Sequence, residues 1–182
     1  MDRATKIVIV GGVAGGASAA TRARRMDERA EIILIEKDAH VSFANCGLPY
    51  YIGEEITRRE ALLVATPEFL RRRFRLDVRT DEEVLAIDRQ QKTVRIRRSA
   101  DGQEYEQAYD KLILTPGASP LVPPLSGVEA TNVMTLRNVA DTDRIKAVVD
   151  GRPQGRPFAC ARRGGCASER RTRGRVRRVA GC

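Results

Sequence analysis

The chain has 182 residues, enough for one domain with a substantial core and few for two. No apolar stretch approaches the roughly 20 residues that a membrane-spanning helix needs, and glycines interrupt the early apolar run Ile7–Val10, so we expect neither a membrane anchor nor a signal peptide. Without an export signal we expect a cytoplasmic protein, whose cysteines are free thiols or catalytic groups.

The net charge of +9 is confined to the C-terminal segment. Of the 33 basic and 24 acidic residues, ten arginines and one acid, Glu169, lie in residues 151–182, so residues 1–150 carry 23 of each. Three of the four cysteines, Cys160, Cys166 and Cys182, also lie there. We therefore divide the chain into an N-terminal domain, residues 1–150, and an Arg/Cys/Gly-rich tail, residues 151–182.

The tail shows neither helical nor strand periodicity and has few residues to bury. We expect it to be disordered, or to be the product of GC-rich DNA read out of frame. Out-of-frame GC-rich codons yield Arg, Gly, Ala, Pro and Cys. The composition also permits a nucleic-acid-binding arm, which we favour less. A zinc site is weaker still, because five residues separate Cys160 from Cys166 with no histidine nearby, and we predict no metal.

The domain begins with a strand–helix–strand pattern. Residues 6–10 are apolar and β-branched, as in a strand buried on both faces, and the alanine-rich residues 17–28 favour a helix. Residues 31–38 predict a second buried strand that ends in acidic residues. This order predicts a βαβ unit with parallel strands.

The rest of the domain predicts two helices, then strands, then a closing helix. Residues 46–56 resemble a short helix, and residues 66–74 a second one with Thr66 as N-cap and Pro67 at its first position. Asp101-Gly102 predicts a hairpin. Further strands are expected at residues 76–80, 82–88, 92–98, 103–109, 110–118 and 131–138, and a helix at 139–150. The predicted fold is α/β: a Rossmann-like domain with a parallel central sheet and a small antiparallel insertion around residues 76–109.

A glycine cluster lies between the first strand and the first helix, where backbone N–H groups and the positive helix end can bind a pyrophosphate. Reading G-x-G-x-x-G from Gly11 places Val13 at the middle glycine and Gly16 at the last. Glu36 follows 20 residues after Gly16, at the end of the second strand, where a carboxylate can accept bonds from an adenosine ribose. We predict dinucleotide binding over an ordinary strand–helix turn, and the pattern leaves the dinucleotide open.

Cys46 is the only cysteine in residues 1–150. It precedes a predicted short helix, and a positive helix end stabilises a thiolate. Asn45 and Ser42 add hydrogen-bonding groups. The residues alone leave open whether Cys46 is reactive or a buried small hydrophobe.

Five segments resemble the coenzyme A-disulfide reductases, single-cysteine members of the flavin- and pyridine-nucleotide-dependent disulfide oxidoreductases. They read KIVIVGGVAGGASAATRARR, IEKDAHVSFANCGLPYYIG, LLVATPE, YDKLILTPGASP and TLRNVADTDRI, in register from Lys6 to about Asp150. The resemblance implies that the glycine cluster binds FAD, with valine usual at the middle position. The implied FAD-binding residues are Gly11, Gly12, Val13, Ala14, Gly15, Gly16, Glu36, Lys37, Thr115, Pro116, Gly117, Ala118 and Arg137.

The resemblance further implies that Cys46 is the catalytic thiol, alternating between a thiolate and a mixed disulfide with coenzyme A. Relatives with a C-x4-C pair have a second cysteine where this chain has Tyr51, so the partner sulfur must come from the substrate. The implied coenzyme A-binding residues are Ser18, Arg22, Arg25, Ser42 and Asn45. Without the resemblance, the stripe Ser18, Arg22 and Arg25 reads as a solvated helix face.

The implied function is reduction of coenzyme A disulfide, or of related persulfides, with NAD(P)H. Peroxidase relatives carry a histidine where this chain has Ala14, which favours the disulfide or persulfide substrate. Family members are longer: they continue into an NAD(P)H-binding segment, a returning FAD segment and a dimerisation domain that makes a homodimer. We expect this chain to be incomplete, with little turnover. The alternative is a non-catalytic FAD- or nucleotide-binding module. His40 and residues 71–73 are expected on the surface.

Overall fold

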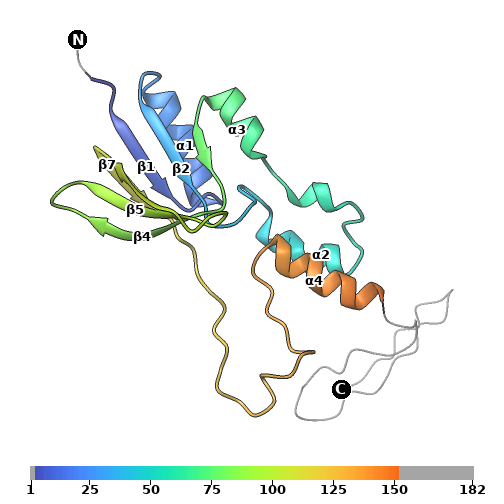
Figure 1. Cartoon of the computed structure of the whole chain (residues 1–182). Coiled ribbons are helices and arrows are strands. Elements are labelled where there is room, and N and C mark those ends of the chain that lie inside the picture. The colour runs from blue at the N-terminus through green and yellow to red at the C-terminus, as the bar shows by residue number, and fades with distance from the viewer. Residues whose placement is uncertain (1–2, 152–182) are drawn as a thin grey trace, which may run out of the picture.

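The computed structural model describes residues 3–151, so the predictions for the tail, apart from Gly151, concern residues outside the described part. Four parallel strands form a central sheet in the order β3-β2-β1-β7, with β7 at one edge (Figure 1). Val10, the last residue of β1, pairs with Ile35 and with Leu114, the last residues of β2 and β7. The carboxyl ends of these three strands therefore lie at the same edge of the sheet. The strands are β1 (Lys6–Val10), β2 (Glu31–Ile35), β3 (Asp77–Arg79) and β7 (Lys111–Leu114).

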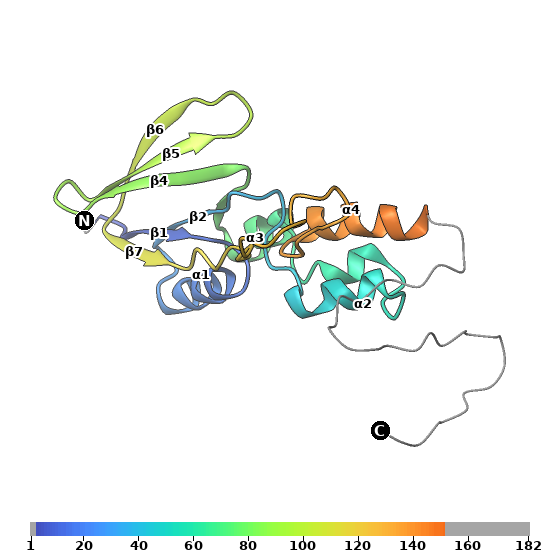
Figure 2. The same ribbon diagram turned by 90° about the horizontal axis from the view of Figure 1, so that it is seen from below.

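Both faces of the parallel sheet are covered, which explains why the central strands β1 and β2 are apolar after their first residues. On one face, Ile9 and Leu34 pack with Ala20 of helix α1 (Gly15–Met26) and with Leu70. On the other, Val8 and its neighbours pack against a second sheet. Figure 2 shows α1 and this second sheet on opposite sides of β1 and β2. The predicted βαβ unit and α/β fold class are confirmed.

The second sheet is antiparallel and consists of β4 (Glu82–Asp88), β5 (Thr93–Arg98) and β6 (Glu104–Ala108). The predicted hairpin joins β5 to β6, and Gly102 has the positive φ of +70° that its turn requires. The predicted start of the insertion near Leu76 is wrong. Residues 77–79 instead form β3 and pair with β2, because Val78 is buried beside Leu34 in the parallel sheet.

The remaining helical segments are η1 (Asn45–Gly47), α2 (Leu48–Ile52), η2 (Arg59–Leu62), α3 (Pro67–Phe74) and α4 (Val139–Asp150). Thr66 caps α3 as predicted, since its Oγ1 accepts a bond from Phe69 N at 3.2 Å. Asn138 and Asp141 form a capping box at the start of α4. The strand predicted at residues 131–138 is wrong: this segment pairs with no strand. Residues 71–73 are exposed, as predicted.

Arg24 is buried near the end of α1, where its guanidinium donates to backbone carbonyl groups. Its guanidinium donates to the carbonyl oxygens of Phe74 and Arg75, at 2.8 and 3.0 Å, beyond the last turn of α3. It also donates to those of Glu28 and Ala30, at 2.8 and 2.7 Å, in the connection to β2. One side chain therefore joins α1, α3 and the start of β2.

An ion pair joins α4 to η2. Arg59 donates from Nε and Nη2 to the two carboxylate oxygens of Asp143, both at 2.8 Å. His40 lies beside this pair, 3.5 Å from Arg59 Nη2, and is half-buried rather than fully at the surface. The hydrogen bond from Arg59 lowers the pKa of Asp143.

This lowered pKa predicts a loss of stability in acid. A carboxyl group whose pKa is lower in the folded state stabilises the fold above its unfolded pKa of about 3.9 and ceases to do so as pH falls through the folded value. Asp143→Asn should therefore reduce the free energy of unfolding near neutral pH, and its difference from the wild type should shrink below about pH 4. Urea unfolding across this range measures the difference, and a difference that does not change with pH contradicts the prediction.

Candidate functional site

A cavity of about 440 Å³ opens at the carboxyl end of the parallel sheet, where β1, β2 and β7 end together. Ligands of open α/β sheets bind at this edge. Its walls come from the loop after β1, the loop after β2, the segment after β7 and the start of α4. The lining residues are Val13, Ala14, Gly15, Glu36, Lys37, Asp38, Phe43, Asn45, Thr115, Pro116, Gly117, Ala118, Ser119, Pro120, Thr135, Arg137, Asn138 and Asp141.

The glycine loop and the segment after β7 pack directly against each other. Gly11 has φ of +91°, and a Cβ there would lie 2.1 Å from the carbonyl oxygen of Thr115. A Cβ at Gly16 would lie 1.7 Å from the carbonyl oxygen of Gly11. Thr115 Oγ1 donates to the carbonyl oxygens of Val10 and Gly11, both at 2.9 Å. Because no side chain fits between these backbones, the first and last glycines fix the shape of the cradle.

Glu36 is buried on the floor of the cavity, with its carboxylate directed toward the glycine loop. Its Oε2 accepts a bond from Gly12 N at 2.7 Å, and its Oε1 accepts one from Asp38 N at 3.1 Å. Each carboxylate oxygen has a further lone pair. The acid that the sequence singled out therefore lines the same cavity as the glycine loop.

Cationic side chains lie on two walls. Lys37 follows Glu36, and Arg137 lies against Gly117, where an added Cβ would come within 2.7 Å of Arg137 Nη2. Asp38 and Asn138 close the space between the loop after β2 and α4, since Asn138 Nδ2 donates to Asp38 Oδ2 at 3.0 Å. The cations suit a ligand with phosphates.

Cys46 lies in η1 and is exposed, so it is not a buried small hydrophobe. Its neighbour Asn45 lines the cavity. Ser42, which begins this segment, has a left-handed φ of +46° and is held by backbone bonds: its N–H donates to the Gly12 carbonyl at 3.0 Å, and its carbonyl accepts from Val64 N at 2.8 Å. The cysteine segment is thus hydrogen-bonded to the glycine loop.

Three predicted coenzyme A-binding residues, Ser18, Arg22 and Arg25, are exposed on α1 and do not line the cavity. The sequence did not predict five polar lining residues: Asp38, Ser119, Thr135, Asn138 and Asp141. The Asn138–Asp141 spacing is a capping signal for α4, but nothing in it indicates that this helix begins at the cavity. Within residues 3–151, no three His, Cys, Asp or Glu side chains are grouped to hold a metal. No helix in that range is both long and apolar enough to span a membrane.

A family model described as pyridine nucleotide-disulphide oxidoreductase matches residues 5–153. A coenzyme A disulfide reductase of Staphylococcus aureus (strain JH9) is 47% identical over 140 residues, which cover 77% of this chain and 31% of that protein. The same-named protein of the bovine strain RF122 / ET3-1 is 45% identical over 144 residues, 79% of this chain and 32% of that one. This chain therefore spans about a third of the length of these relatives.

Two solved structures are similar in fold to this chain. The reduced CoADR-RHD of Bacillus anthracis has 53% sequence identity and a TM-score of 0.79, over 82% of this chain and 27% of that one. An NAD-dependent persulfide reductase from A. fulgidus has 36% identity and a TM-score of 0.76, over 80% of this chain and 27% of that one.

Proposed function

Because the chain belongs to the pyridine nucleotide-disulphide oxidoreductase family, we propose that residues 1–150 are the FAD-binding part of a cytoplasmic enzyme that reduces coenzyme A disulfide, or a related persulfide, with NAD(P)H. The observation that carries this proposal is one cavity. It is lined by the glycine loop, Glu36 and residues 115–118, and its wall at Asn45 adjoins the exposed thiol of Cys46.

The residues of the cavity fit FAD. Gly11 and Gly16 leave no Cβ between the backbones of the cradle, so N–H groups at the start of α1 are open to a pyrophosphate. Glu36 would accept bonds from the adenosine ribose hydroxyls, and Lys37 lies next to it. Thr115, Pro116, Gly117 and Ala118 would form the second wall, and Arg137 would offset the negative charge.

Cys46 would carry the thiol chemistry. Its thiolate attacks one sulfur of coenzyme A disulfide, which forms a mixed disulfide with one coenzyme A and releases the other as a thiolate. FAD held in the cavity, once reduced by NAD(P)H, would supply the two electrons that cleave this mixed disulfide, which would release the second coenzyme A and return Cys46 to its thiolate. Because position 51 is a tyrosine, no second sulfur at that position could displace coenzyme A, and the mixed disulfide would persist until it is reduced.

The rest of the proposed reaction requires chain beyond residues 3–151. The proposed coenzyme A-binding residues are Ser18, Arg22, Arg25, Ser42 and Asn45; the arginine forks of α1 suit the phosphates of this substrate. The matched part is about a third of the length of the Staphylococcus aureus relative, and we assign NAD(P)H binding and homodimer formation to residues with no counterpart in residues 1–150. We therefore expect little NAD(P)H-dependent turnover from this chain.

The first test is thiol exchange without any reductant. Coenzyme A disulfide should modify the Cys46 peptide with one coenzyme A, at least about tenfold faster than glutathione disulfide forms its adduct, because the phosphates add binding energy. Peptide mass mapping locates the adduct, with the peptides of Cys160, Cys166 and Cys182 as internal references. The double variant Arg22→Gln/Arg25→Gln should lose the selectivity and keep the glutathione rate. Equal rates with both disulfides in the wild type contradict the proposed substrate.

FAD binding is measured separately, by quenching of flavin fluorescence. The proposal that residues 1–150 belong to a coenzyme A-disulfide-reducing enzyme requires both FAD binding and selective exchange at Cys46. A non-catalytic FAD-binding module would show FAD binding alone. A chain that binds no FAD contradicts both.

A further inference from the structure

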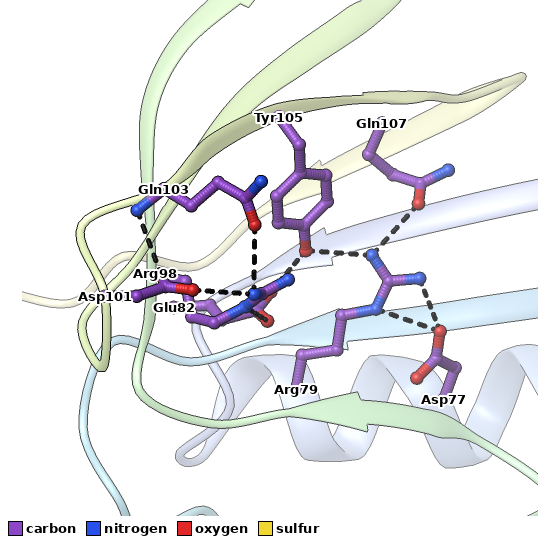
Figure 3. A network of polar contacts seen from close by, with 8 residues as sticks. All are labelled: Asp77, Arg79, Glu82, Arg98, Asp101, Gln103, Tyr105 and Gln107. Carbon is purple, nitrogen blue, oxygen red and sulfur yellow. Dashed lines mark hydrogen bonds and ion pairs between the residues drawn. The ribbon is translucent and has the colours of Figure 1, made fainter.

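A polar network joins the edge of the parallel sheet to the antiparallel sheet, and Tyr105 lies at its centre (Figure 3). We infer that Tyr105 is a positioning residue for Glu36: its hydroxyl holds the segment between β3 and β4, and that segment fixes the backbone on both sides of Glu36. The inference rests on the proposed role of Glu36 as the carboxylate that binds the adenosine ribose.

The hydroxyl of Tyr105 joins two charged side chains from consecutive strands. It accepts a bond from Arg79 Nη1 at 3.0 Å and donates to Oε2 of Glu82. Arg79 is held in place by further bonds: Nη1 donates to Gln107 Oε1 at 3.0 Å, and Nη2 donates to Asp77 Oδ2 at 2.6 Å. Burial and the bond to Glu82 raise the pKa of Tyr105, so the phenol keeps the proton that it donates.

The same two residues bind the backbone of Glu36. The N–H of Glu36 donates to the carbonyl oxygen of Arg79 at 2.8 Å, and the carbonyl oxygen of Glu36 accepts from the N–H of Glu82 at 3.1 Å. Arg79 and Glu82 thus hold Glu36 from both sides through their main chains, while their side chains share one hydroxyl.

These two backbone hydrogen bonds determine where the Glu36 carboxylate lies. At the far end of the side chain, Glu36 Oε2 accepts a hydrogen bond from Gly12 N at 2.7 Å. The carboxylate therefore lies between the glycine loop and a backbone that the network holds in place. A loss of the shared hydroxyl frees Arg79 and Glu82 to move apart. The carboxylate then loses the alignment that bonding to a ribose hydroxyl requires.

A purely structural role is the alternative: the network would only hold the two sheets together. This role predicts a lower free energy of unfolding and no change in how the site distinguishes ligands. A positioning role predicts a specific loss of preference for the hydroxyl that Glu36 binds. The ratio of the Kd of 2′-deoxy-ADP to that of ADP separates the two, because the ligands differ in one hydroxyl.

The experiment compares this ratio in four proteins. The wild type should prefer ADP by about tenfold, the effect of one hydrogen bond to a charged group. Tyr105→Phe should reduce the preference to about twofold to threefold, and Glu36→Gln should reduce it at least as far. Tyr109→Phe is the matched control and should keep the full preference. Tyr109 packs against the same core cluster as Tyr105, and its hydroxyl makes only a 3.4 Å bond to the Asp88 carbonyl.

Calorimetric titration measures each Kd, and urea unfolding monitored by circular dichroism verifies that each variant is folded. If Tyr105→Phe does not fold, Arg79→Lys provides the same test, since a single ammonium nitrogen does not reproduce the planar guanidinium fork that reaches Asp77, Tyr105 and Gln107. A folded variant with the full preference for ADP overturns the inference and leaves the role of Glu36 intact. A wild type with no preference overturns the role of Glu36, and the inference with it.

Discussion

Replacing Gly16 by alanine is expected to destabilise the domain by about 3 kcal/mol or more and to abolish FAD binding. The added Cβ would lie 1.7 Å from the carbonyl oxygen of Gly11 and 2.9 Å from Thr115 Oγ1. The nearer atom belongs to the backbone of the cradle, so the clash is relieved only if the glycine loop moves away from α1. Urea unfolding gives the loss of stability, and quenching of flavin fluorescence gives the loss of binding.

Gly15→Ala is the matched control, because it adds the same methyl group one residue away. There the nearest atom is Thr115 Cγ2, a side-chain atom at 3.0 Å, which can shift slightly. Alanine also favours the first turn of α1 over glycine by about 1 kcal/mol. We expect this variant to fold with nearly wild-type stability. Equal losses of unfolding free energy in the two variants would show that the close approach of Gly16 to Gly11 is not what determines stability.

The second large effect is expected for Arg24→Met, which should lower the free energy of unfolding by about 3 kcal/mol. Methionine keeps the apolar stem but removes the donor from the buried carbonyl of Ala30 and from the partly buried bonds to the carbonyls of Phe74 and Arg75. Burial lowers the pKa of the guanidinium, yet arginine stays protonated in proteins. The carbonyl oxygens therefore stabilise a charge that has been removed from water.

Arg25→Met is the control for this change, since Arg25 is the next residue of α1 and is exposed. Its effect on stability should stay within about 0.5 kcal/mol. Urea unfolding of both variants measures the contrast. If Arg24→Met is no less stable than Arg25→Met, the carbonyl bonds contribute nothing net.

The arrangement of the glycine loop and Glu36, the proposed nucleotide-binding half of the site, could be predicted because its determinants are local. Gly11, Gly16 and Glu36 occupy positions that a strand–turn–helix–strand unit places together, whatever surrounds it. The cap at Thr66 and the hairpin at Gly102 were likewise predictable from neighbouring residues.

The errors concern partners distant in sequence. Residues 131–138 have strand propensity, but a strand also needs another strand to bond its backbone, and here none of the described strands is adjacent. The short strand at Val78 follows α3 and pairs with β2, where Val78 is buried in the same cluster as Leu34 and Leu70. Arg79, Glu82 and Tyr105 read as ordinary strand residues, since their network exists only once β3, β4 and β6 are assembled. The buried role of Arg24 depends on α3 in the same way.

The position of β7 at the sheet edge has a practical consequence for concentrated solutions of this chain. None of the strands in residues 3–151 bonds its outer side, so amide and carbonyl groups there remain available to a strand from another molecule. Lys111 is its one charged residue, and Leu114 at the other end is 53% exposed. Aggregation through intermolecular strand pairing at this edge should therefore increase with protein concentration, and a second charge on β7 should oppose it.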